Sequence, residues 1–152
     1  MYQGRIGFSE LAGFNASFAY STVSSNQSVL LGAGNGPTTY TAPLIKGAEV
    51  TSGADTDAYK VEIGYDFSKI GVTGLKALGQ YTKVNQDAKT ITGAVLNSVT
   101  VDTESKFWSG QIAYDIPSLK GLTLSLEYED AKKDDTVTVN SNEMRFRDNY
   151  KF

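Results

Sequence analysis

The side chains that could do chemistry in this sequence are carboxylates, amines and guanidinium groups, because it contains neither cysteine nor histidine. Without histidine, the chain lacks the commonest general base and metal ligand, and Ser-His and Cys-His nucleophile pairs are excluded. Without cysteine, it has no disulfide and no thiolate metal site. Only carboxylate chemistry remains, so we expect no enzyme, no metal and no cofactor.

Other common functional signals are also weak. The stretch GAGNG at 32–36 looks like a phosphate-binding loop, but no following Lys-Ser or Lys-Thr supports it, and we interpret it as a turn. The net charge is −3 and no basic run is present, so we expect no nucleic-acid partner. No stretch approaches 18 apolar residues, and MYQGRIGF lacks the features of a signal peptide.

Three similar stretches organise the chain. Each contains Leu or Ile, a short link, a glycine and then an alternating segment that ends in tyrosine. Gly13, Gly74 and Gly121 provide the backbone freedom that a tight turn needs. We therefore predict a β-hairpin with a short connection at each of them: GFSELAGFNASFAY (7–20), DFSKIGVTGLKALGQY (66–81) and DIPSLKGLTLSLEY (115–128).

Apolar and polar residues alternate along the segments between these turns, which is the period of a strand with one apolar face. Pairs of residues six positions apart mark the two ends of each apolar stripe. Because six is even, both members face the same way. The pairs predict seven strands: Tyr2 and Phe8, Phe14 and Tyr20, Tyr59 and Tyr65, Leu75 and Tyr81, Trp108 and Tyr114, Leu122 and Tyr128, Phe146 and Phe152.

The connections between these strands alternate in length. Short turns follow Phe8, Tyr65 and Tyr114, whereas long polar stretches follow Tyr20, Tyr81 and Tyr128. An all-β, antiparallel, up-and-down sheet with short turns at one rim and long loops at the other is the plan of a transmembrane β-barrel of the outer membrane. We predict one barrel domain over 1–152, with long extracellular loops at about 25–56, 83–105 and 130–142.

A soluble barrel with its apolar stripe facing inward would alternate in the same way. Soluble cores are usually filled by Val, Ile, Leu and Phe, with aromatic residues scattered rather than placed at stripe ends. Here tyrosine holds half of the border positions, which suits residues at a membrane–water interface. The predicted aromatic girdle consists of Tyr2, Tyr20, Tyr59, Tyr65, Tyr81, Trp108, Tyr114, Tyr128 and Tyr150.

The ending NYKF, the alternation of the last strand and the turn DFSKIGVTGL resemble Gram-negative porins of the OprD type and related major outer-membrane porins. The resemblance covers the three turn units and the last strand, about half of the chain. It implies that the terminal residues are a signal for the barrel-assembly machinery: Met144, Phe146, Tyr150 and Phe152. Asp148 departs from this pattern, because it places a carboxylate where an apolar residue is expected.

Such porins are much longer and close with an even number of strands. An open sheet of seven strands leaves edges that hydrocarbon cannot satisfy. We therefore expect the chain to be the C-terminal portion of a larger barrel, and Met1 not to be its natural start.

If the apolar face meets lipid, the polar face lines a pore. The predicted lining residues are Arg5, Lys60, Glu62, Lys76, Gln111, Glu127, Arg145 and Arg147. The resemblance implies a basic ladder that guides carboxylate-bearing solutes, whereas the numerous acids could simply balance these bases. The loop at 25–56 contains apolar clusters, VLLGAGNG and APLI. We expect it either to constrict the lumen or to pack on a neighbouring subunit.

The expected function is passive diffusion of small hydrophilic solutes or ions across the outer membrane of a Gram-negative bacterium. The expected partners are membrane lipid, these solutes, the barrel-assembly machinery and a second copy of the chain in a homo-oligomer. One alternative is a complete eight-stranded outer-membrane barrel with a surface or adhesion role and a strand hidden in 25–56. Another is a soluble barrel that binds an apolar ligand.

Overall fold

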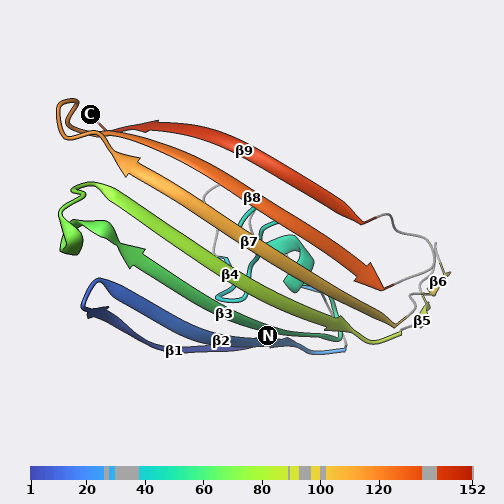
Figure 1. Cartoon of the computed structure of the whole chain (residues 1–152). Coiled ribbons are helices and arrows are strands. Elements are labelled where there is room, and N and C mark those ends of the chain that lie inside the picture. The colour runs from blue at the N-terminus through green and yellow to red at the C-terminus, as the bar shows by residue number, and fades with distance from the viewer. Residues whose placement is uncertain are drawn as a thin grey trace.

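In a computed structural model, the chain forms one seven-stranded antiparallel sheet with neighbours in the order β1-β2-β3-β4-β7-β8-β9 (Figure 1). The structure describes residues 1–25, 28–29, 38–88, 90–92, 97–99, 102–134 and 140–151. The strands are β1 (Tyr2–Leu11), β2 (Phe14–Val23), β3 (Thr56–Asp66), β4 (Leu75–Gln86), β7 (Thr103–Asp115), β8 (Leu122–Asp134) and β9 (Ser141–Tyr150). The prediction of an all-β, up-and-down sheet with seven strands is confirmed.

Three short connections lie together at one end of the sheet, at the left of Figure 1. They join β1 to β2, β3 to β4 through the single-turn helix η2 (Phe67–Ile70), and β7 to β8. At the other end, β5 (Thr90–Thr92) and β6 (Asn97–Val99) form a separate two-stranded hairpin within the β4–β7 connection.

Two of the connections at that second end are shorter than the predicted loops, whereas the β2–β3 connection at 24–55 matches the predicted 25–56. The strand β4 continues to Gln86 and β7 begins at Thr103, so their connection is 87–102 rather than about 83–105. Likewise β8 continues to Asp134 and β9 begins at Ser141. The backbone ladder continues beyond the apolar stripe, where the polar ends of these strands still pair in register, for example Gln86 with Thr103.

The apolar stripe lies on the exposed face of the sheet. The side chains of Ile6, Trp108, Ile112 and Phe146 are between 56% and 75% exposed. A soluble barrel that sequesters its apolar residues would show the opposite. Within the described residues, the sheet therefore presents an apolar surface outward and its polar side chains to the other face.

A small core forms on the polar face, where part of the long β2–β3 connection lies against the sheet. Ala58, Val84 and Phe107 are almost fully buried there, and Val50 and Ala131 pack against them. Val50 belongs to the single-turn helix η1 (Ala48–Thr51) of that connection. In the described part of the chain, we find no helix with the length and apolar composition needed to cross a membrane.

Candidate functional site

The eight predicted lining residues share one face of the sheet. Register and alternation place them opposite the exposed apolar side chains, on strands β1, β3, β4, β7, β8 and β9. They do not meet in a single cluster. Instead, they divide into a group around Glu62, a group around Glu127 and two separate ion pairs.

Glu62 is the centre of the first group. One carboxylate oxygen accepts a hydrogen bond from Arg5 at 3.1 Å, and the other accepts one from the side-chain amide of Gln80 at 2.9 Å. The ammonium of Lys60 lies 3.5 Å from the same carboxylate. These contacts link β1, β3 and β4 across the polar face.

Glu127 organises the second group in the same way. Its two oxygens accept hydrogen bonds from Gln111 at 2.9 Å and from Arg147 at 3.0 Å, which joins β7, β8 and β9. The two remaining lining residues form pairs of their own. Arg145 bonds Glu143 at 2.7 Å, and Lys76 bonds Asp115 at 3.1 Å.

The arginines of the two groups are much more exposed than the acids that they bind. The side chains of Arg5 and Arg147 are 48% and 46% exposed, whereas those of Glu62 and Glu127 are 15% and 6% exposed. Both arginines belong to the edge strands β1 and β9, whereas both acids belong to strands that have a neighbour on either side.

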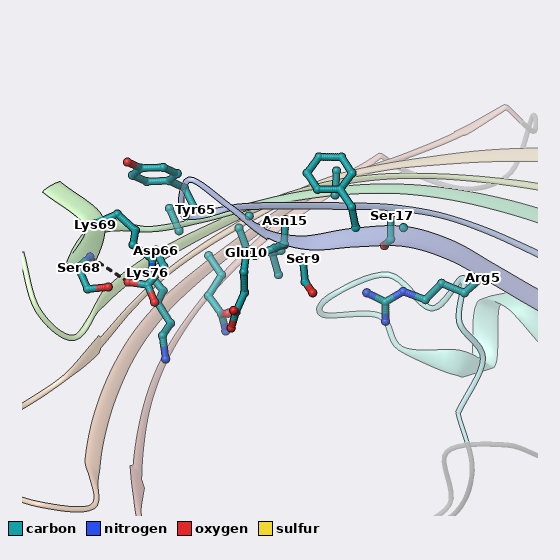
Figure 2. Close-up of a pocket in the computed structure, with 18 of the residues that line it drawn as sticks. Arg5, Ser9, Glu10, Asn15, Ser17, Tyr65, Asp66, Ser68, Lys69 and Lys76 are labelled. Carbon is teal, nitrogen blue, oxygen red and sulfur yellow. Dashed lines mark hydrogen bonds between the residues drawn. The ribbon is translucent and has the colours of Figure 1, made fainter.

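Next to the first group, the polar face is hollow. A cavity of about 990 Å³ lies toward the short-turn end of β1–β4, and its lining includes Arg5, Glu10, Lys76 and Gln111. Figure 2 shows Arg5, Glu10 and Lys76 on one side of the sheet and the ring of Tyr65 on the other. Tyr40, from the β2–β3 connection, also lines the cavity.

That connection crosses the polar face and is here called the strap, residues 38–55 (teal in Figure 1). It contacts every strand of the large sheet, although it leaves and rejoins the sheet at adjacent strands. Its partners, in strand order, are Gln3, Ser21, Lys60, Val84, Phe107, Glu129 and Glu143.

The contact of the strap with β8, the last strand but one of the sheet, is made by Glu129. Its side chain is among the most deeply buried in the described structure, at 1% exposure. The two carboxylate oxygens accept hydrogen bonds from the backbone N–H groups of Ile45 and Lys46, each at 2.9 Å, and the Ser109 hydroxyl donates a third at 2.8 Å.

From the sequence, Glu129 is only one of the numerous acids that could balance the lining bases. Its alternation with Glu127 on β8 predicts the face, but its partners on the strap are 84 and 83 positions away. No local pattern encodes such a contact. The apolar clusters of the 25–56 loop gave the only signal that this loop would pack against something; of these, Ile45 lies on the polar face, whereas GAGNG lies outside the described residues.

The predicted girdle residues all lie on the exposed face, and several are in contact across strands. The rings of Tyr81 and Trp108 are 4.4 Å apart between centroids, and those of Tyr20 and Tyr59 are 5.0 Å apart. These two pairs border the stripe at the long-loop end. At the short-turn end, Phe14 and Tyr65 form a third pair at 4.5 Å.

The predicted assembly signal is only partly within the described structure. Met144, Phe146 and Tyr150 are exposed on the apolar face of β9, and Phe152 lies outside the described residues. Asp148 lies on the same face and pairs in register with Leu124. The recognition of these residues by assembly machinery stays a prediction.

One carboxyl group beyond the stripe has a strongly shifted pKa. Glu104 lies four residues past Trp108, outside the aromatic border, between the ammonium groups of Lys106 and Lys83, each 2.6 Å away. Hydrogen bonds from Lys106 and then Lys83 lower the pKa of Glu104 to about 2. This group is therefore ionised throughout the physiological range.

Among the described residues, no cluster of three or more acids has a geometry that could hold a metal ion.

The fold has close counterparts among solved porin structures. Over 97% of its length, the chain superposes on 37% of Pseudomonas aeruginosa OpdQ with a TM-score of 0.75 and 18% identity. It also matches a BenF-like porin from Pseudomonas fluorescens Pf-5, with a TM-score of 0.63 and 17% identity over 93% of this chain and 34% of that one.

Acinetobacter baumannii OccAB4 is similar with a TM-score of 0.63 and 23% identity, over 91% of this chain and 32% of that chain. The sheet has a porin fold. No protein-family model matches the sequence, and no curated protein sequence matches it. The resemblance to OprD-type porins is thus confirmed for the fold, and the chain spans about a third of the length of the porins that it matches.

Proposed function

We propose that this chain forms part of the wall of an outer-membrane porin in a Gram-negative bacterium, through which small hydrophilic solutes or ions diffuse passively. One observation carries the proposal. The sheet exposes a continuous apolar surface on one face and holds paired charges on the other. That distribution suits a wall between lipid and water, because lipid-facing and lumen-facing residues alternate along a barrel strand.

The open edges of the sheet also favour the interpretation that the chain is part of a larger barrel. The strands β1 and β9 each have one neighbour in the sheet of described residues. In hydrocarbon their free backbone groups would be costly, so further strands must complete the wall. We place this chain at the C-terminal portion of that barrel, on the resemblance of its last strand.

The position of the strap on the polar face favours a constriction of this passage. The strap lies on the polar face across the full width of the sheet and leaves the 990 Å³ cavity open beside it. The predicted rival, an eight-stranded barrel with a strand in 25–56, gains no support from the described part of that loop. Residues 38–55 form turns and the single-turn helix η1 there.

A preference for carboxylate-bearing solutes is the finer part of the proposal. The guanidinium groups of Arg5 and Arg147, which are more exposed than the acids that they bind, support it. Fixed positive charge at a pore wall lowers the barrier for an anionic group. Their acid partners Glu62 and Glu127 reduce this effect, and they are the less exposed member of each pair.

The test is planar-bilayer recording of the full-length protein under a salt gradient. Wild-type protein should form open channels, and the double variant Arg5→Gln/Arg147→Gln should shift the reversal potential toward cation preference. Lys132→Gln is the control, because Lys132 is 61% exposed but lies on the other face. An unchanged reversal potential in the double variant would exclude the anion preference. Absence of channels in wild-type protein would exclude the porin function.

A further inference from the structure

The strap depends on one buried carboxylate for the position of its tip, the Ile45–Lys46 segment, which contacts β8 and β9. Glu129 accepts both backbone N–H groups of the Ile45–Lys46 segment, and all three of its hydrogen-bond donors are neutral. Hydrogen bonds to an ionised acceptor are shorter and stronger than bonds between neutral groups. A carboxylate with such donors is well stabilised, and the donors have no comparable acceptor if it is removed.

The other contacts of the strap lie nearer to its ends or are weaker. The hydroxyls of Ser21 and Thr41 are 2.6 Å apart close to the start, and Lys60 reaches the carbonyl of Ala42 at 3.3 Å. Beyond Glu129, the ion pair of Lys46 with Glu143 is long, at 3.5 Å, and both side chains are about one third exposed. Exposed pairs of this kind contribute little.

Glu129 binds the backbone of the strap rather than its side chains. Both bonds use N–H groups of the main chain, so they fix the path of residues 45 and 46 whatever side chains stand there. The side chain of Ile45 is itself buried, at 6% exposure, and Lys46 extends to β9. Ser109 orients the carboxylate, because its hydroxyl donates to the same oxygen that Ile45 uses.

We propose that Glu129, oriented by Ser109, is the positioning residue that holds the tip of the strap across the passage and so sets its width. This inference rests on the proposed porin function for the passage, whereas the anchoring itself does not. Release of the tip would leave the strap attached near Ser21 and through Val50, but free to move away from β8 and β9. The open passage would then be wider and its conductance less steady.

Glu129→Gln is the appropriate substitution, because it keeps the size and one acceptor oxygen. Its NH₂ group would face a backbone N–H donor, which leaves that donor unpaired. Loss of one charge-assisted bond in a buried site corresponds to roughly a tenfold to hundredfold change in an opening equilibrium. Ser109→Ala removes one donor and no acceptor, so its effect should be smaller but in the same direction.

Cysteine labelling reports the position of the tip directly. The chain has no native cysteine, so Ile45→Cys gives it a single thiol, at a site that is closed in the anchored state. Any cysteine elsewhere in the full-length protein is replaced by serine beforehand. In outer membranes containing the full-length protein, this thiol should react with a water-soluble maleimide at least about tenfold faster with Glu129→Gln than without it. The matched control is Glu127→Gln. That carboxylate is on the same strand and similarly buried, but it bonds Gln111 and Arg147 instead of the strap.

Single-channel recording of Glu129→Gln supplies the second measurement, with higher and noisier conductance expected. The heat-dependent shift in gel mobility that folded barrels show verifies that each variant is folded, and Ser109→Ala replaces Glu129→Gln if the latter does not fold. Labelling of the introduced thiol at the control rate in a folded variant would overturn the anchor. Fast labelling with unchanged conductance would keep the anchor and overturn its effect on passage width. Absence of channels in wild-type protein would instead count against the porin function.

Discussion

Gly74 shows how a single residue sets the geometry of a short turn. Its φ of +88° lies in the left-handed region, and a Cβ added there would collide with the carbonyl oxygen of Asp115 on the neighbouring strand. Gly71, in the same turn, has a φ of +94° but open space around the corresponding position. Substitution of Gly71 therefore tests backbone strain alone, whereas substitution of Gly74 tests strain together with a steric collision.

We expect Gly74→Ala to lower the free energy of unfolding more than Gly71→Ala. Both variants place alanine in a left-handed conformation, at a cost of about 1–2 kcal/mol. Only Gly74→Ala must also displace Asp115, at the end of β7, from the β3–β4 turn. Urea unfolding of the full-length protein in detergent, followed by tryptophan fluorescence, measures both. Equal losses would mean that the collision is relieved without cost.

At the scale of elements, strands and strap differ in how they are stabilised. The strands are held by ladder bonds over their whole length, for example in the twelve-residue β4, which pairs with both neighbours. The strap has no ladder. It depends on Glu129 and on the insertion of Val50 among Ala58, Val84 and Phe107.

Phe107→Ala should therefore loosen the strap while the sheet persists. Phe107 is 5% exposed, and truncation of a buried phenylalanine costs about 3–5 kcal/mol when the cavity does not collapse. Limited proteolysis should show faster cleavage within 38–55. The control is Ile112→Ala, on the same strand but 56% exposed on the opposite face. Equal protection of the strap in both variants would show that the cluster does not hold it.

The contrast between sheet and strap explains what could be predicted from the sequence. Strand number and facing follow from alternation, which is local: Leu122, Leu124 and Leu126 can face only one way if Glu127 faces the other. The facing of Arg5 and Glu62 was predictable for the same reason. Their pairing with each other was not, because it depends on how three strands lie in register. The path of the strap depends on contacts between positions more than eighty residues apart, for which the sequence contains no period or motif.

At the scale of the whole molecule, the two faces of the sheet should meet different surroundings. The apolar face carries Trp108, the one tryptophan of the chain, at 57% exposure and at the aromatic border. The next residue along the strand, Phe107, is buried beneath the strap on the other face. A tryptophan moved by one position would therefore report on the opposite side of the wall.

Fluorescence quenching by brominated lipids tests this arrangement in reconstituted full-length protein, in which any tryptophan outside this chain is first replaced by phenylalanine. Trp108 should be quenched strongly, and more by bromines placed near the headgroups than by bromines at the bilayer centre, because interfacial aromatic residues lie at the edge of the hydrocarbon. In the variant Phe107→Trp/Trp108→Phe, the single indole lies under the strap, so brominated lipids should have little effect. Quenching of wild-type protein by aqueous iodide but not by brominated lipid would mean that the apolar face meets water or protein instead of the bilayer. The porin function would then lose the observation on which it rests.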